Sequence, residues 1–165
     1  MVWGKNGTPD TLTSANKTTE ITDLTAKTFN VFLHHVLKVS GNPFTWLNYD
    51  SDTASRYARR RNKNYGNDTT DETTNKVYFG DGMSSGDVEF NLVYSINIDG
   101  EEKLGLSWQV SNRLGTGAGT LPSSGEGAHK YNNGASNPQY TAINLHGDSS
   151  NLWATNTNLS ALGTD

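Results

Sequence analysis

The sequence predicts an all-β protein, an antiparallel β-sandwich of jelly-roll-like form with an N-terminal arm and long loops rich in Gly, Ser and Asn. The first observation is a period of two, because apolar side chains occupy almost every second position from Val88 to Ile98. Asp99-Gly100 then supplies turn chemistry, and the alternation resumes from Leu104 to Val110. The second observation is compositional: Asn, Thr, Ser and the 17 Gly favour turns and are poor residues for a helix interior.

These two segments predict a half-buried antiparallel hairpin whose apolar side chains turn toward the core. Trp108 lies on the apolar side of the alternation and is therefore expected in the core. The whole chain carries about six to eight segments of strand character, a number that suits a jelly roll or a related sandwich. In such folds function resides in surfaces and loops rather than in the sheet itself.

The N-terminal part is less regular than this hairpin. Residues 1–20 are polar and rich in Thr and Asn, which predicts an arm or first edge strand, and residues 21–165 then form a single sandwich domain. Residues 28–39 fit a strand and an amphipathic helix equally well, and we prefer a strand because β-branched and aromatic residues dominate. Short strands are expected at 44–49 and 77–79, with a polar stretch at 50–71 between them.

The C-terminal part is dominated by turn-forming residues. Residues 111–138 consist largely of Gly, Ser, Asn and Pro, and the segment is too long for a hairpin turn. Loops of that length in compact domains are usually functional or ordered by a partner. A strand is expected to resume at 139–145, and a last one lies within 152–162.

Composition restricts the class of protein. Hydrophobic residues form only 33% of the 165 residues, so much of the chain must be loop, surface or contact with other subunits. The net charge of -4 argues against a whole-surface nucleic-acid footprint. The absence of cysteine excludes a disulfide framework, a cysteine zinc site and a thiolate nucleophile. No signal peptide and no stretch of about 18 apolar residues is present, which predicts synthesis in a cytoplasm and no membrane partner.

Catalytic motifs are weak. The segment from Gly82 to Gly86 matches the nucleophile elbow with Ser84 at its centre, but that motif needs a strand-to-helix turn, and a strand follows here. The glycines from Gly115 to Gly119 lack the Lys-Ser/Thr of a phosphate-binding loop. We therefore expect no enzyme activity, no catalytic residue and no cofactor, with a serine hydrolase as the minor alternative.

Histidine spacing does not indicate a metal site. His34 and His35 are adjacent, so on a strand they point to opposite faces, and His129 and His146 are distant in sequence. We therefore expect no bound metal, unless ligands meet by tertiary contact or between subunits.

A basic cluster interleaved with aromatic residues stands out in the polar stretch. Its main members are Arg56, Tyr57, Arg59, Arg60 and Arg61. Arginine with aromatic residues can hold single strands or phosphate, but on an acidic protein a loop of this kind more often pairs with carboxylates, within the chain or on a neighbouring subunit. A charge contact is thus the preferred interpretation, nucleic acid is a less favoured one, and a solvated loop is the third.

Three tryptophans lie in polar segments: Trp3, Trp46 and Trp153. They are candidates for subunit contacts or for ligand stacking, and we prefer subunit contacts because interfaces are enriched in aromatic residues. A chain of low apolar content gains burial by association with copies of itself.

Short segments in order along most of the chain resemble small virion structural proteins of marine tailed phages and related uncultured viruses. These segments are Val2-Trp3-Gly4-Lys5, Leu24 to Asn30, Ser55 to Arg60, Ile96 to Leu104, Gly117 to Pro122, Lys130 to Asn133, and Asn158 to Asp165. The chain departs from the expected pattern after the Gly-Ala-Gly turn, where it has Pro122-Ser123-Ser124 and Lys130-Tyr131 in place of Pro-x-Arg-x-Glu followed by Lys-Trp.

The resemblance implies a β-sandwich subunit repeated on a particle. The leading hypothesis is a non-enzymatic capsid decoration protein that assembles as a homo-oligomer, with a trimer as the first guess, and binds the major capsid protein or another virion protein. Expected contact elements are the arm around Trp3, the basic segment from Arg56 to Lys63 and residues 115–138. The alternative is a glycan-binding or receptor-binding module of a tail or fibre that uses Trp46 and Trp153.

Overall fold

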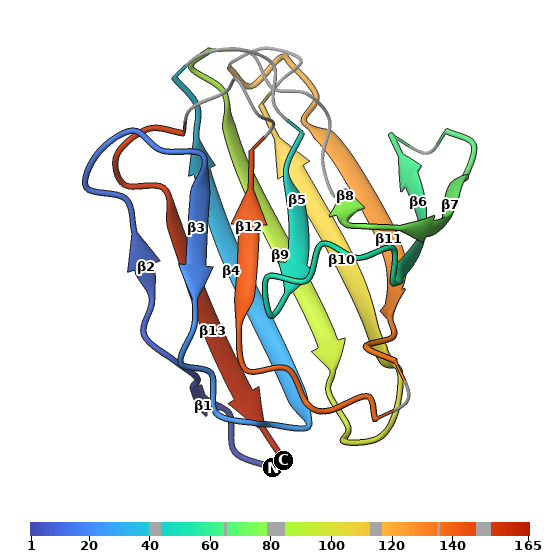
Figure 1. The fold of residues 1–165 in the computed structure, drawn as a ribbon. Helices are drawn as coiled ribbons and strands as arrows, with labels where there is room; N and C mark the ends of the chain where they lie inside the picture. The colour runs from blue at the N-terminus through green and yellow to red at the C-terminus, as the bar shows by residue number, and fades with distance from the viewer. Residues whose placement is uncertain (40–43, 65, 79–84, 113–116, 135, 148–152) are drawn as a thin grey trace.

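The structure is a computed structural model that describes residues 1–39, 44–64, 66–78, 85–112, 117–134, 136–147 and 153–165. Within these residues the chain forms thirteen β-strands in two antiparallel sheets that pack against each other as a sandwich (Figure 1). The described residues contain no helix long and apolar enough to span a bilayer. The predicted all-β sandwich is confirmed.

The larger sheet has nine strands. Along the sheet they are β1 (Gly4–Lys5), β13 (Asn158–Thr164), β4 (Phe29–Leu37), β9 (Val88–Ile96), β10 (Lys103–Ser111), β11 (Ser123–Tyr131), β6 (Tyr57–Lys63) and β7 (Thr69–Thr74), while β2 (Asp10–Thr11) also pairs with β13. The first and last strands pair, so the two ends of the chain lie side by side at one end of the sandwich (Figure 1).

The smaller sheet has four strands and covers one face of the larger one (Figure 1). In order they are β3 (Thr18–Ile21), β12 (Ile143–His146), β5 (Trp46–Tyr49) and β8 (Val77–Tyr78). The core between the sheets contains Phe32, Val36 and Val93 from the larger sheet and Leu47 and Leu145 from the smaller one.

Four tyrosines fill one end of this core. Tyr49 stacks on Tyr140 with ring centroids 4.4 Å apart, and Tyr57 stacks on Tyr131 at 4.7 Å. All four side chains are buried. Stacked rings of this size bury much apolar area, and buried hydroxyls usually find hydrogen-bond partners. The Tyr57 hydroxyl, for example, donates to the backbone oxygen of Asp52 at 3.1 Å.

The inner face of the larger sheet is otherwise rich in polar side chains. Glu89 is fully buried, and its carboxylate accepts hydrogen bonds from Thr45 Oγ1 at 2.8 Å, Asn91 Nδ2 at 2.6 Å and Gln109 Nε2 at 2.8 Å. Burying a charge is tolerable only when hydrogen bonds replace its water shell. The network therefore fixes β9 and β10 against the segment that leads into β5.

The alternation in the hairpin is real, but the prediction of which side faces the core is wrong. The polar residues of β9 and β10 point inward, and all of their apolar residues except Val93 point away from the smaller sheet. Trp108, expected in the core, keeps 44% of its surface exposed. The reason is that hydrogen-bonded side chains, among them Glu89, Asn91 and Gln109, occupy the core side of this hairpin, and buried tyrosines pack beside them.

Several element predictions are confirmed. Residues 28–39 form a strand, β4, and the expected strands at 44–49 and 77–79 appear as β5 and β8. The last strand, β13, starts within the predicted 152–162 segment. The N-terminal twenty residues contain β1 and β2 and most of β3, so the boundary proposed after residue 20 falls inside a strand.

Other element predictions are wrong. The supposed long loop at 111–138 contains β11, a nine-residue strand paired on both sides. The basic segment, expected as a loop, is largely β6. The described part of the chain also has thirteen strands where six to eight were expected. Neither β11 nor β6 shows apolar alternation, and both are ordered by their neighbours in the sheet.

Candidate functional site

The outward positions of β4, β9 and β10 form a continuous apolar surface, which we call the apolar sheet face. Strand register places the side chains in cross-strand rows, such as Leu33, Leu92 and Trp108 side by side. Of the outward positions on these strands, His35 alone is not apolar or aromatic. The members are Phe29, Val31, Leu33, Leu37, Val88, Phe90, Leu92, Tyr94, Ile96, Leu104, Leu106, Trp108 and Val110.

Many of these side chains are well exposed. Val88, Phe90 and four members on β10 keep between 37% and 51% of their surface accessible. If large apolar side chains offer 150–250 Å² each, these six alone expose roughly 500 Å². The largest apolar patch on a typical monomer measures about 300–600 Å² and is often functional. The apolar sheet face reaches that range before its half-buried members are counted.

The two margins of the face differ. On the β13 side it continues through Leu162, and Trp3 packs against Tyr94 with ring centroids 6.1 Å apart. On the β11 side the outward residues are Ser124, Glu126, Ala128 and Lys130, which are small or charged. The apolar surface therefore extends toward the N-terminal arm and ends at β11.

A shallow trough runs along β11 between β10 and β6, and we call it the Trp108 trough. Two hollows of about 220 Å³ and 140 Å³ share Trp108, Asn62 and Glu126 in their linings. The floor is low because the outward positions of β11 on either side of Glu126 carry only the small side chains of Ser124 and Ala128. The strand register pairs Trp108 with Glu126 and Glu126 with Asn62. These three residues therefore form a row across the trough, one from each of β10, β11 and β6.

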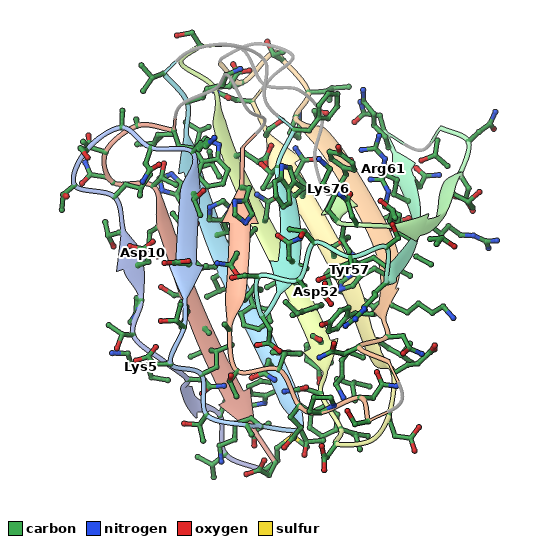
Figure 2. The ribbon with its side chains drawn as sticks, viewed as in Figure 1. Lys5, Asp10, Asp52, Tyr57, Arg61 and Lys76 are labelled. Carbon is green, nitrogen blue, oxygen red and sulfur yellow. The ribbon has the colours of Figure 1, made fainter. Side chains whose placement is uncertain are left out.

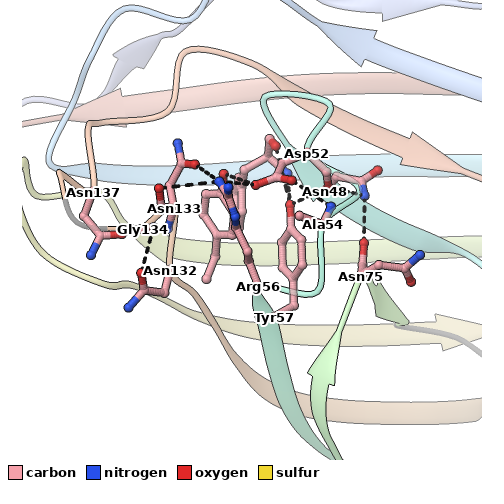
Figure 3. Close-up of polar contacts among 12 residues, drawn as sticks. Asn48, Asp52, Ala54, Arg56, Tyr57, Asn75, Asn132, Asn133, Gly134 and Asn137 are labelled. Atoms are coloured by element: carbon pink, nitrogen blue, oxygen red, sulfur yellow. Dashed lines mark hydrogen bonds and ion pairs between the residues drawn. The ribbon is translucent and has the colours of Figure 1, made fainter.

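The start of the basic segment belongs to a polar cluster at the β5–β6 connection (Figure 3). The Asp52 carboxylate accepts hydrogen bonds from Arg56 at 3.2 Å and from the Tyr131 hydroxyl at 2.9 Å. Arg56 also bonds to Asn133. Asn48 Nδ2 donates to the backbone oxygen of Asp52 at 2.9 Å, which closes the turn. This cluster holds three segments of the chain together.

The remaining arginines of the basic segment also find partners inside the chain. Arg59 donates to the Tyr78 backbone oxygen at 3.0 Å, and its guanidinium lies 4.7 Å from the centre of the Tyr78 ring. Arg60 pairs with Asp68 at 3.9 Å, and Arg61, farther along β6 (Figure 2), donates to Thr69 at 3.4 Å. Arg56 and Arg60 thus pair with carboxylates of the same chain, which agrees with the intrachain form of the preferred interpretation; a charge contact with a neighbouring subunit stays a prediction.

Two of the residues proposed to contact a partner are buried in the core. Trp153 is fully buried, with its ring 4.9 Å from that of His34, and Tyr57 is buried in the tyrosine stack. Their assignment to a partner or ligand contact is therefore wrong. Trp3 remains exposed at the margin of the apolar sheet face.

Trp46 lies on the outer side of the smaller sheet. Its ring stacks on His146 at 4.0 Å, and the Lys76 ammonium lies 4.7 Å from its centre. Both contacts use the ring surface that a ligand would need. Trp46 is therefore a poor platform for stacking.

The histidines do not gather, and the described residues hold no cluster of His, Cys, Asp and Glu that would bind a metal. Burial lowers the pKa of His34 to about 3, with a contribution from neighbouring His35, and lowers that of His129 to about 4. Both imidazoles are therefore neutral at neutral pH. His129 contacts the Tyr49 hydroxyl through Nε2 at 2.9 Å, which is a structural role.

The two catalytic motifs considered above lie largely outside the described residues. Gly82 to Ser84 of the elbow-like motif and residues 115–116 of the glycine-rich segment fall outside the part of the chain that the structure describes.

Comparisons with known proteins identify no family. No family model matches the chain, and no curated protein matches it. A solved structure with some similarity is the alginate lyase Aly36B in complex with alginate tetrasaccharide, at 13% identity and a TM-score of 0.33, over 95% of this chain and 80% of the lyase chain. A likeness at that TM-score carries no argument about function.

Proposed function

We propose that this chain is a non-enzymatic structural subunit that assembles with copies of itself through the apolar sheet face. The observation that supports the proposal is the size and continuity of that face. Exposed apolar patches at the upper end of the monomer range mark interaction sites, because leaving such surface in water is costly. A second copy removes it from water, and closed homo-oligomers are the commonest outcome of such association.

The dimensions suit a protein interface. A stable interface buries about 800 Å² per partner. The exposed members of the apolar sheet face, its half-buried members and the adjoining Leu162 and Trp3 approach that area on one continuous side of the molecule. The interior of the sandwich is unusually polar, so the most apolar part of the hairpin lies outside the domain core.

The resemblance to virion structural proteins suggests that this assembly takes place on a virus particle. A homo-oligomer bound to a capsid lattice would stabilise the shell by mass action, since disassembly would expose the buried surface again. Within the proposal the protein is a decoration subunit, the major capsid protein is its partner, and a trimer is the expected oligomer. The pairing of Arg56 and Arg60 with carboxylates of the same chain leaves assembly to the apolar face rather than to the basic segment.

The test compares oligomeric states in solution by size-exclusion chromatography with light scattering. The wild type is expected to be an oligomer at micromolar concentration, and the double substitution Phe90→Lys, Leu104→Lys is expected to be a folded monomer. Both side chains point outward, so the fold does not need them. The matched control Thr22→Lys, Ala26→Lys adds the same charge at exposed positions of the β3–β4 connection and is expected to remain oligomeric.

A monomeric wild type at 100 µM would overturn the assembly proposal. So would a double variant that keeps the wild-type mass. The virion role has its own test, which is the copy number of the protein on intact particles measured by quantitative mass spectrometry. Absence from purified particles would overturn that role while leaving self-assembly in place.

A further inference from the structure

We propose that the Trp108 trough is a carbohydrate-binding site for a neutral pyranose chain. The site adjoins the surface proposed for assembly and shares Leu106 and Trp108 with it, but its polar groups come from β11 and β6. The argument has three parts: an open aromatic wall, a low floor, and a balanced set of polar groups.

Trp108 is the wall. The other tryptophans differ from it: Trp153 is buried, the ring of Trp46 contacts His146 and Lys76, and Trp3, although exposed, has a ring contact with Tyr94. Among the described residues, no aromatic ring or cation covers the indole of Trp108, and 44% of its surface is exposed. The C–H face of a pyranose is apolar and weakly electropositive, and it is attracted to the electron-rich face of an indole.

The floor of the trough is β11. The small side chains of Ser124 and Ala128, at the outward positions that flank Glu126, leave space beside Trp108. The two hollows, of about 220 and 140 Å³, lie on either side of Glu126. Taken together they fall at the small end of the range for ligand pockets. An open trough of this form accepts an extended chain more readily than a compact ligand.

Polar groups line the opposite side. The Glu126 carboxylate lies in register between Trp108 and Asn62, and it is well placed to accept hydrogen bonds from sugar hydroxyls. The Asn62 amide and the Arg60 guanidinium offer donors. A hydroxylated ring needs donors and acceptors along one edge and an apolar surface below it.

The charge balance selects a neutral sugar. Arg60 and Arg61 are offset by Asp68 and Glu126, which line the same trough, and Arg60 already pairs with Asp68 at 3.9 Å. A strongly anionic polysaccharide would meet the Glu126 carboxylate without a surplus of positive charge to compensate. A neutral chain meets no such penalty.

The test is affinity electrophoresis in native gels that contain soluble polysaccharides. The neutral probes are laminarin, dextran, galactomannan and xyloglucan, and polygalacturonate is the anionic probe. Retardation by at least one neutral polysaccharide is expected, and isothermal titration with oligosaccharides of that polymer then gives the Kd. The experiment is run on the wild type and on the monomeric Phe90→Lys, Leu104→Lys variant, so that a trough covered by assembly is still tested.

Three substitutions identify the site. Trp108→Ala is expected to weaken binding at least tenfold, and Glu126→Gln threefold to tenfold. Trp3→Ala removes another exposed tryptophan and is expected to bind as the wild type does. The outward position of Trp108 predicts an unchanged fold, which circular dichroism and the unfolding midpoint verify.

Four results would overturn the proposal. They are no retardation of either form, retardation by polygalacturonate alone, unchanged binding by Trp108→Ala, and an equal loss with Trp3→Ala. None of them bears on self-assembly, which is measured by mass in solution.

Discussion

Mild acid is expected to destabilise this protein through two buried histidines. His34 packs against Trp153 and lies 3.2 Å from Thr19 Oγ1, and His129 lies 2.9 Å from the Tyr49 hydroxyl. Burial lowers the pKa of His34 to about 3 and that of His129 to about 4. In the unfolded chain both groups take up a proton near pH 6.5.

The sign follows from proton uptake. Above pH 6.5 both groups are neutral in the folded and unfolded states, and they contribute nothing to the pH dependence. As the pH falls below 6.5, the unfolded state binds protons that the folded state excludes, so stability is lost until the folded pKa values near 4 and 3 are reached. At pH 5 each group is 1.5 units below the unfolded pKa, which corresponds to about 2 kcal/mol each and about 4 kcal/mol together.

Urea unfolding between pH 7.5 and pH 5.0, followed by tryptophan fluorescence, measures this loss. The monomeric Phe90→Lys, Leu104→Lys variant is the suitable background, because association would add its own concentration dependence. A fall of at least about 4 kcal/mol in the unfolding free energy is expected, since burial also lowers the pKa of His146 to about 4, and His129→Gln is expected to reduce the fall by about 2 kcal/mol. A fall of less than about 1 kcal/mol would refute the reasoning, as would a His129→Gln variant with the full pH dependence.

Three further substitutions test how the fold is held. Lys103→Met removes an ammonium that is buried and donates to the backbone oxygens of Ile98, Glu101 and Asn137, and chemical unfolding is expected to show a loss of about 3 kcal/mol from unsatisfied carbonyls. Gly105→Ala would place a Cβ 2.3 Å from the His129 ring, and the cost of about 2 kcal/mol is expected to lower Tm by roughly 4–8 °C in calorimetry. Arg56→Ala is expected to cost less than about 1 kcal/mol in the same assay, because its ion pair is exposed; a larger loss would show that the polar cluster acts as a unit.

The hairpin shows how far alternation alone can predict a fold. A period of two identifies a strand and its turn, and β9 and β10 lie where the sequence predicts them. The period is symmetric, however, and does not say which side faces the core. That choice depends on partners distant in sequence, such as Thr45, which bonds to Glu89 across the interior. The candidate site follows from this choice, so it was not predictable from the pattern.

Strand β11 is the opposite case, a strand that its own sequence pattern does not predict. Residues such as Gly125 and Gly127 have no strand preference, and they are held extended because β10 and β6 pair with them on both sides. At the outward positions of the same strand, the small residues Ser124 and Ala128 open the trough beside Trp108. Composition predicted a long loop for this segment, which is wrong, because its order comes from pairing with β10 and β6 that only the folded chain supplies.

The polar interior of the sandwich also has a thermodynamic consequence. Exposure of apolar surface raises the heat capacity on unfolding, whereas exposure of polar surface lowers it. A core in which amides and the Glu89 carboxylate occupy much of one sheet face should therefore unfold with a small heat capacity change for its length, and its stability should vary little with temperature. Burial of the apolar sheet face would carry a large heat capacity change of its own. Cooling should thus loosen contacts between copies before it affects the fold of each one.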